Sequence, residues 1–232
     1  MMTVRKSLDR GHANHGWLDS YHTFSFGSYY DAAHMGVSSL RVINEDRIAP
    51  EGGFAPHDHH DMEIISYVLE GALEHQDSMG NRSIIRPGEV QRMSAGTGIT
   101  HSEFNPSSSE SVHFLQIWIT PAVTGIAPGY EQTYFTEESK RGKLRLVASS
   151  DGAETSLTIH QEVRLYATLI DGNTVLRHHT VPGKRYYTQI TRGTLCINDE
   201  ALQAGDGALL FDEPLIQLSS GNNAEALLFE LP

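Results

Sequence analysis

The sequence has little cysteine and no cluster of basic residues. The single cysteine, Cys196, cannot form an internal disulfide. No run is long and apolar enough to cross a bilayer, and the polar first residues lack the apolar core of a signal peptide. Together these features predict a cytoplasmic location. The net charge of -12, with no stretch of five or more basic residues, argues against nucleic acid or an anionic membrane as a partner.

Turn signals are frequent, and short runs of β-branched and aromatic residues lie between them. The clearest runs are SLRVI (39–43), EIISYVLEG (63–71), SIIR (83–86) and VHFLQIWI (112–119). Short strands separated by turns predict an antiparallel sandwich or barrel. No long segment has the 3.6-residue period of an amphipathic helix. The sequence therefore predicts an all-β protein.

The chain also divides into two similar halves. Residues 120–147 contain several prolines and glycines with few apolar pairs, and this composition predicts a long connector. Beyond it the strand pattern resumes, and EIISYVLEGALEH (63–75) is echoed by YYTQITRGTLCIN (186–198). We therefore expect two tandem antiparallel β-barrels, with domains at 1–125 and 126–232.

Two segments, HDHHDME (57–63) and HSE (101–103), concentrate histidine and glutamate. Side chains two residues apart share one face of a strand, so His57 points with His59, and His101 points with Glu103. Two neighbouring strands could thus offer three imidazoles and one carboxylate to a single transition metal ion. The alternative is a set of surface histidines in a chain that has 13 of them. Glu63 has the same parity as His59, so the residues alone do not choose between Glu63 and Glu103.

These segments resemble two known motifs. GGFAPHDHHDMEIISYVLEG (52–71) resembles the first cupin motif, and RPGEVQRMSAGTGITHSEFN (86–105) resembles the second. Three further segments are similar to the pirin family: HTFSFGSYYD (22–31), MGVSSLRVINEDRIAP (35–50) and SVHFLQIWITP (111–121). The resemblance covers nearly all of residues 16–121. It implies a bicupin fold, with a metal-binding cupin domain at 1–125 and a degenerate, metal-free cupin domain at 126–232.

The resemblance also implies which residues bind the metal. The pirin pattern assigns His57, His59, His101 and Glu103 as ligands of one divalent transition metal, and it leaves Glu63 as a neighbour of the site or a strand residue. Iron is favoured by its availability in cells, and nickel, copper, manganese, cobalt or zinc also suit these ligands. In the second half, His178 and His179 are adjacent and face opposite ways, which argues against a second site.

The activity implied by the resemblance is that of a quercetin 2,3-dioxygenase, which uses dioxygen to cleave a flavonol and releases carbon monoxide. Glu103 is then the catalytic residue, taking the proton of the flavonol 3-hydroxyl. The alternative function is a metal- or redox-sensing regulatory protein that acts through a protein partner, because eukaryotic pirins are iron-dependent transcription cofactors. We expect a small flavonol-like substrate and dioxygen as partners, and a monomer.

Other residues are less informative. His22 could belong to the pocket, whereas Phe24 and Phe26 are expected to pack in the core. His60, on the face opposite His59, is expected to be structural, and the isolated His75 and His160 receive no function. Parity leaves open whether the run 112–119 turns Gln116 and Trp118 inward, or His113 and Ile117.

Overall fold

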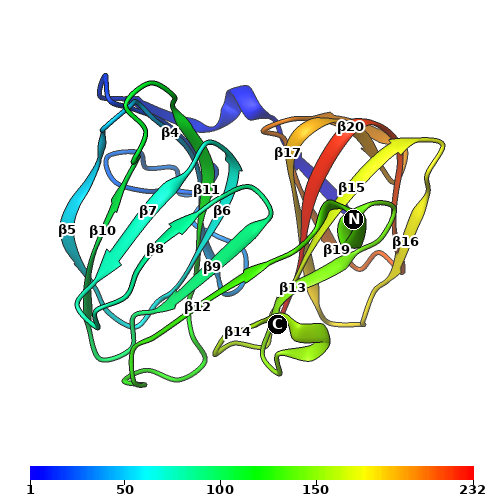
Figure 1. Ribbon diagram of the computed structural model, residues 1–232. Helices are drawn as coiled ribbons and strands as arrows, with labels where there is room; N and C mark the ends of the chain where they lie inside the picture. Colours follow the sequence, from blue (N-terminus) through cyan, green and yellow to red (C-terminus); the bar gives the residue numbers. More distant parts are fainter. The chain divides into compact units, whose positions relative to one another are not determined.

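The computed structural model describes residues 1–232 and is almost entirely β structure, arranged in two compact units (Figure 1). The N-terminal unit consists of Gly11–Tyr134 and Leu157–Gln161. The C-terminal unit consists of Met1–Arg10, Phe135–Ser156 and Glu162–Pro232. The expected all-β class is confirmed. None of the helices has the length and apolar character needed to span a membrane.

The units differ from the predicted ranges 1–125 and 126–232 in three short segments. Residues 1–10 belong to the C-terminal unit because their strand pairs with a later one, Met2 lying opposite Leu210. Residues 126–134 and 157–161 belong to the N-terminal unit. The division into domains at 1–125 and 126–232 therefore stays a prediction.

Two antiparallel sheets form the N-terminal unit. The larger has the order β12-β9-β6-β11-β4-β3-β2, and the smaller has the order β5-β10-β7-β8. The strands of the larger sheet are β2 (Gly11–Asn14), β3 (Leu18–His22), β4 (Leu40–Ile48), β6 (Glu63–Glu70), β9 (Glu89–Ser94), β11 (Val112–Ile119) and β12 (Gly129–Tyr134). Those of the smaller sheet are β5 (Gly53–His59), β7 (Leu73–Asp77), β8 (Arg82–Ile85) and β10 (Ile99–Phe104). The short strand β14 (Leu157–Thr158) also lies in this unit.

Apolar side chains from both sheets meet in one core. Leu73 and Ile85 from the smaller sheet pack with Val68 and Phe114 from the larger one, and all four are almost fully buried. Burying side chains of this size stabilises the fold by about 1.5–3 kcal/mol each. The two sheets are therefore held face to face at this end, and the polar residues described below occupy other positions between them.

The predicted strands at 39–43, 63–71, 83–86 and 112–119 correspond to β4, β6, β8 and β11. The predicted connector at 120–147 is wrong in part, because β12 lies within it and pairs along β9 from Gly129 to Tyr134. The same range holds the helix α1 (Glu137–Lys140) and the start of β13 (Arg145–Ser149). Both prolines and two of the three glycines lie at or before position 129, and this turn-rich start concealed the strand that follows.

The C-terminal unit is built on two long strands, β17 (Arg185–Ile197) and β20 (Leu215–Leu231), which pair with each other through several register shifts. Such shifts bend long strands and let one sheet wrap around its own core. The main path of the sheet includes β1-β19-β17-β20-β15-β13, with β16 paired to β20 and β18 paired to β17. The remaining elements are β1 (Met2–Arg5), η1 (Ser7–Asp9), η2 (Ala153–Thr155), β15 (Arg164–Gly172), β16 (Leu176–His179), β18 (Glu200–Gln203) and β19 (Gly207–Phe211).

Strand β10 lies between β5 and β7, and this position determines what can meet in the smaller sheet. His101 is opposite His57 on one side and opposite Asp77 on the other. Directly opposed residues point to the same face of a sheet, so these side chains share one face. Between His101 and Glu103 the pairing with β5 shifts, so that Glu103 lies opposite Phe54. The shift gives β5 one extra residue around Pro56, which has no N–H to donate to a ladder.

Asn105, just beyond β10, ties the end of that strand to two other segments. Its Nδ2 donates to the carbonyl oxygens of Ile48, Ala49 and Glu110, at 3.1, 3.2 and 2.8 Å. We expect Asn105→Ala to lower the free energy of unfolding by about 2–3 kcal/mol, because three carbonyl groups, including the buried one of Ile48, lose their donor. Urea denaturation measures this value. Asn14→Ala, a change at an exposed asparagine, serves as the control, and an equal effect of both changes would contradict the role given to Asn105.

Candidate metal centre

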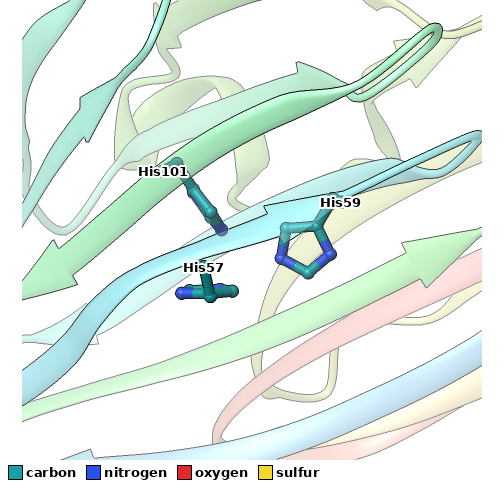
Figure 2. Close-up of side chains that lie close together, drawn as sticks. All are labelled: His57, His59 and His101. Carbon is teal, nitrogen blue, oxygen red and sulfur yellow. The ribbon is translucent and has the colours of Figure 1, made fainter.

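Three histidine rings from β5 and β10 gather at one point of the N-terminal unit (Figure 2). The ring centroid of His101 lies 4.5 Å from that of His57 and 4.8 Å from that of His59, and the last two lie 4.8 Å apart. Each ring offers one nitrogen to a group whose ligand atoms all lie within 4.8 Å of one another. The expected common face of His57 and His59 is confirmed, and so is the meeting of the two strands.

A second group shares His101 and contains Glu103 with His75. These three residues are buried, and their ligand atoms also lie within 4.8 Å of one another. The structure therefore places Glu103 next to the histidine that both groups have in common. The assignment of His57, His59, His101 and Glu103 as one ligand set remains a prediction, and this arrangement is compatible with it.

The electrostatics of the rings favour neutral imidazole. Burial, together with the neighbouring His57, lowers the pKa of His59 to about 4, although Asp58 acts to raise it. Burial and the rings of His57, His59 and His75 lower the pKa of His101 to about 2. A neutral imidazole has one nitrogen lone pair free to bind a metal. These histidines therefore keep the protonation state that a ligand needs at neutral pH.

Two ring nitrogens show a fit to a metal ion. His57 Nδ1 lies 2.8 Å from the carbonyl oxygen of Ala55, which only accepts, so this nitrogen donates and the lone pair is on Nε2. His101 Nε2 is buried and has no hydrogen-bond partner. A buried polar atom without a partner costs about 1–3 kcal/mol unless some group satisfies it. A divalent cation that binds the lone pairs of His57 Nε2 and His101 Nε2 satisfies both nitrogens.

Glu103 is held from the larger sheet. Its Oε1 accepts from Ser66 Oγ at 3.2 Å, and its Oε2 accepts from Gln116 Nε2 at 2.6 Å. Trp118 Nε1 donates to Gln116 Oε1 at 3.2 Å, which turns the amide nitrogen of Gln116 toward Glu103. Burial raises the pKa of Glu103 to about 7; the hydrogen bonds from Ser66 and Gln116 act to lower it, and the charge of Asp46 acts to raise it. Glu103 is thus able to gain or lose a proton near neutral pH.

A polar row on the larger sheet lies across from these groups. Ser66, Gln116, Asn44 and His22 are opposed in register along four neighbouring strands, so their side chains share one face. His22 Nδ1 lies 2.9 Å from Asn44 Oδ1. Of the two parities left open at 112–119, the structure selects Gln116 and Trp118 for the inner face.

His57, His59 and Glu103 line a cavity of about 640 Å³. Its walls include the aromatic side chains of Trp17, Phe26, Phe54 and Trp118. Its polar lining residues include His15, Ser20, His22, Ser28, Asn44, Asp46, His57, His59, Glu103 and Gln116. A cavity of this size with apolar walls and a few convergent polar groups suits a small aromatic ligand.

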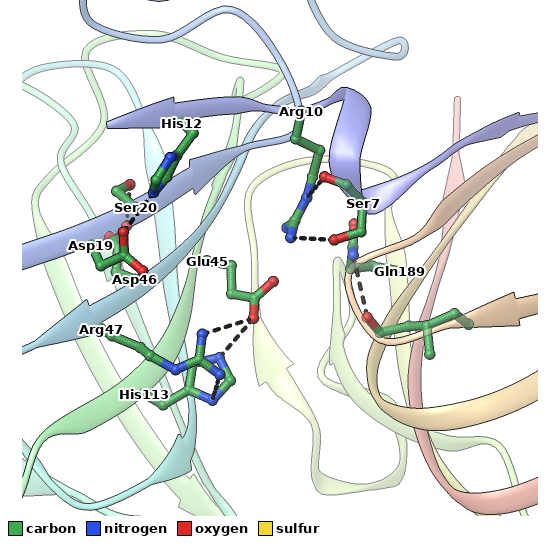
Figure 3. Close-up of polar contacts among 11 residues, drawn as sticks. Ser7, Arg10, His12, Asp19, Ser20, Glu45, Asp46, Arg47, His113 and Gln189 are labelled. Carbon is green, nitrogen blue, oxygen red and sulfur yellow. Dashed lines mark hydrogen bonds and ion pairs between the residues drawn. The ribbon is translucent and has the colours of Figure 1, made fainter. Parts of the chain in front are cut away.

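A second carboxyl group, Asp46, lines the same cavity although its residue is only 2% exposed. Ser20 Oγ donates to Asp46 Oδ1 (Figure 3). Burial raises the pKa of Asp46 to about 7, the bond from Ser20 acts to lower it, and Glu45 adds to the rise. No pattern in the sequence pointed to Asp46, because it lies in a strand, NEDRI, that has no metal-ligand spacing.

The other glutamate considered from the sequence, Glu63, lies outside the site. It accepts from Ser94 Oγ at 3.0 Å, and its Oε1 lies 3.2 Å from His160 Nδ1, so it contacts neither His57 nor His59. The parity argument fails here because residues 60–62 form a turn between β5 and β6, and alternation does not continue through a turn. His160, given no function, is thus the partner of Glu63.

Several other predicted positions can now be compared with the structure. His22 does line the cavity, and Phe24 is buried as expected. Phe26 packs against Trp118, with ring centroids 5.3 Å apart, and it also lines the cavity. Its role is therefore wider than the core packing expected from the sequence. His60 is largely exposed and lies 2.8 Å from Asp61, away from the three rings.

His75 and Asp77 on β7 are the residues near the site that the sequence did not reveal. His75 Nδ1 lies 3.4 Å from His101 Nδ1, and His75 Nε2 lies 3.1 Å from Asp77 Oδ2. Burial acts to raise the pKa of Asp77, but hydrogen bonds from Asn81 and His75 outweigh it and the pKa lies below its ordinary value. Burial lowers the pKa of His75, although Asp77 opposes this. Asp77 is therefore an ionised carboxylate beside a neutral imidazole.

Comparisons with known proteins match this chain along its whole length. A family model described as "Pirin" matches residues 2–119, and one described as "Quercetinase C-terminal cupin domain" matches residues 146–231. The chain is 50% identical over 234 residues to a protein of Escherichia coli K12 named "Quercetin 2,3-dioxygenase", covering 100% of this chain and 99% of that protein.

Solved structures agree with the sequence matches. The bacterial pirin YhhW from Escherichia coli, solved in complex with nickel(II), has a TM-score of 0.95 and 48% identity, covering 100% of this chain and 99% of that one. The Escherichia coli protein YhaK has a TM-score of 0.76 and 31% identity, covering 96% of this chain and 98% of that one. The fold of both units is therefore that of the matched families.

The buried carboxyl of Asp46 predicts a pH-dependent stability. Its pKa is raised from 3.8 to about 7 by folding, so the folded chain holds this proton between those values while the unfolded chain has lost it. The carboxyl therefore destabilises the fold progressively as the pH rises from 4 to 7. We expect Asp46→Asn to be more stable than the parent by roughly 2–4 kcal/mol at pH 8, with the difference shrinking as the pH falls toward 4.

Urea denaturation at several pH values measures this difference. Asp199→Asn, at an exposed turn position with φ +70°, removes a carboxylate from the surface and is the matched control. A gain in stability that is independent of pH, or a loss at pH 8, would show that burial does not raise the pKa of Asp46.

Proposed function

The chain belongs to the pirin family, and on this premise we propose that it is a metal-dependent dioxygenase that cleaves a flavonol. The finer part of the proposal is a quercetin 2,3-dioxygenase reaction in which dioxygen opens the central ring and carbon monoxide leaves. The observation that carries it is the cluster of His57, His59 and His101, with Glu103 beside it, at the wall of an aromatic-lined cavity.

One divalent transition metal is the cofactor, and His57, His59, His101 and Glu103 are the residues we assign to hold it. Three neutral imidazoles and a carboxylate suit iron, nickel, copper, manganese, cobalt or zinc. When bound, such an ion acts as a Lewis acid that lowers the pKa of a coordinated hydroxyl group. Nickel(II) is present in a structure of the relative YhhW, so it is the first ion to test, while availability favours iron in the cell.

We infer that Glu103 accepts a proton from a substrate hydroxyl. Its pKa near 7 matches the pH at which a general base is most effective, because the carboxylate is available and still basic. Gln116 Nε2 donates to Oε2 and Ser66 Oγ donates to Oε1, so both oxygens are fixed in position before a substrate arrives. The residue therefore combines a fixed orientation with a tuned proton affinity.

The cavity accounts for the kind of substrate. Its aromatic walls, Trp17, Phe26, Phe54 and Trp118, suit a flat ring system and exclude water from it. The polar groups of the cavity, among them Asp46 and Ser20, are able to bind hydroxyl groups of the substrate. A polyhydroxylated aromatic such as a flavonol meets both requirements.

The direct test begins with anaerobic loading of nickel(II), iron(II) or another divalent ion, followed by addition of quercetin and dioxygen. The loss of flavonol absorbance and the carbon monoxide in the headspace are measured. We expect metal-dependent carbon monoxide release that is absent in His101→Ala and retained in His12→Ala, a change at an exposed histidine. A protein that binds one metal tightly and leaves quercetin untouched would contradict the proposal and favour a regulatory protein.

The role of Glu103 gives a sharper prediction. Glu103→Gln keeps the size of the side chain and an oxygen for the metal but removes the base. We expect turnover to fall by about 100-fold or more, since a positioned general base contributes about 10²–10⁴-fold. Metal stoichiometry should stay that of the parent, as measured by elemental analysis of the protein after desalting.

Glu63→Gln is the matched control for this variant. Glu63 is also fully buried, at 0% exposed, but it contacts Ser94 and His160 and lies outside the histidine cluster. We expect Glu63→Gln to retain turnover in whatever fraction of the protein folds. Normal turnover by Glu103→Gln would show that another group accepts the proton.

A further inference from the structure

A line of buried polar side chains runs from Asp77, the last residue of β7, to His101 of β10. Asp77 Oδ2 lies 3.1 Å from His75 Nε2, and His75 Nδ1 lies 3.4 Å from His101 Nδ1. His75 and His101 are 0% and 2% exposed, and Asp77 is 8% exposed. The ladder positions explain this alignment, since His101 is opposite Asp77 and Glu103 is opposite His75 across the β7–β10 pair.

The protons along this line can be assigned from the fixed donors at Asp77. The backbone N–H groups of Met79 and Asn81 both donate to Oδ1, at 3.0 Å each. The side-chain Nδ2 of Asn81 donates to both carboxylate oxygens, at 3.2 and 2.9 Å. The carboxylate thus acts as an acceptor at every contact, and the hydrogen bond with His75 requires the proton to be on His75 Nε2.

The assignment then passes to the next ring. A neutral imidazole with its proton on Nε2 has a lone pair on Nδ1, so His75 Nδ1 accepts and His101 Nδ1 must donate. His101 consequently has its own lone pair on Nε2, which is the buried nitrogen that lacks a partner in the protein. Each hydrogen bond in the line fixes the tautomer of the following ring.

We propose that Asp77 and His75 are positioning residues that fix the His101 tautomer with the proton on Nδ1 and the metal-binding lone pair on Nε2. The inference rests on the proposed metal site, for which it supplies the outer partners of one ligand. Carboxylate and imidazole partners of metal-bound histidines commonly orient the ring and fix its proton. Neither Asp77 nor His75 touches the substrate cavity, so their effect on the reaction passes through His101.

The other role open to His75 is that of a metal ligand, since it forms a group with His101 and Glu103. The contacts of the ring favour the positioning role. Both of its nitrogens already have hydrogen-bond partners, and the ring packs beside Tyr130 with centroids 5.0 Å apart. A ligand role requires His75 to give up one of these hydrogen bonds.

The substitution Asp77→Asn tests the assignment because it replaces the carboxylate oxygen that accepts from His75 with an NH₂ group that donates. The oxygen of the asparagine must stay at the Oδ1 position, where two backbone N–H groups donate, so the new NH₂ group faces His75 Nε2. His75 is then driven to carry its proton on Nδ1, and His101 to carry its own on Nε2. The lone pair needed by the metal moves to the wrong side of the ring.

The tautomers are measured in the full chain, free of metal and labelled with ¹⁵N-histidine, by long-range ¹H–¹⁵N correlation, with His101→Gln to assign the signals. We expect the His101 proton on Nδ1 in the parent and on Nε2 in Asp77→Asn. The nickel(II) affinity, from competition with a chelator, should fall by about 10–100-fold in the variant. Because the tautomer is measured without metal or flavonol, it decides this inference even if the proposed reaction proves wrong.

Asp19→Asn is the matched control. Asp19 Oδ1 lies 2.6 Å from His12 Nε2, a carboxylate–histidine pair at the surface of the same unit (Figure 3). It loses the same charge, and we expect neither the His101 tautomer nor the nickel(II) affinity to change. An equal loss of affinity in Asp19→Asn would assign the effect to net charge and overturn the proposal.

His75→Phe decides the question should Asp77→Asn fail to fold, because it keeps a ring beside Tyr130 and leaves the loop contacts of Asp77 intact. We expect both His101 tautomers to be populated and the affinity to fall within the same 10–100-fold range. A parent protein with the His101 proton on Nε2 would overturn the proposal, as would variants that keep the parent tautomer and affinity. Complete loss of nickel(II) binding in His75→Phe would make His75 a ligand and would also overturn it.

Discussion

The antiparallel register of β10 between β5 and β7 is the constraint on which the whole site depends. It places His57 and Asp77 on either side of His101, and it places His75 next to Glu103. A slip of one residue in a strand moves all of its side chains to the other face. Such a slip in β10 would turn His101 away from the rings of His57 and His59, and Glu103 away from the cavity. The positions of these side chains therefore depend on the correct pairing of three short strands.

The apolar core and the polar site have complementary tasks in the N-terminal unit. Side chains such as Leu73, Ile85 and Phe114 join the two sheets and supply the stabilisation. The same sheets bury carboxyl groups at Glu103 and Asp46, whose pKa values both rise to about 7 because burial disfavours their charged forms. Carboxyl groups with pKa values shifted in this way are typical of sites that bind or transform a ligand. The core thus stabilises a geometry that these carboxyl groups by themselves oppose.

Part of this arrangement could be predicted from the sequence. The alternation within HDH and HSE is local, so the shared faces of His57 with His59 and of His101 with Glu103 follow from strand geometry, and the resemblance to the pirin family brought the two segments together. The choice between Glu63 and Glu103 could not be made locally, because a turn separates Glu63 from His59. His75 and Asp77 were missed because their importance arises from the pairing of β7 with β10, and a single sequence does not reveal which strands are neighbours. Asp46 was missed for the same reason, as its partner Ser20 is on another strand.

The two ligands assigned to β10 are fixed from different directions, and this has a consequence for how the site keeps its shape. Glu103 is held across the cavity by Ser66 and Gln116 of the larger sheet, whereas His101 contacts His75 within its own sheet. A movement of one sheet relative to the other therefore changes the hydrogen bonds of Glu103 directly, whereas the contact between His75 and His101 lies within one sheet. Because the hydrogen bonds from Ser66 and Gln116 lower the pKa of Glu103, any change in the spacing of the two sheets also changes that pKa. The bond between His75 and His101 spans no such gap, so the proposed ligand His101 and the proposed base Glu103 depend on different contacts although they lie on one strand.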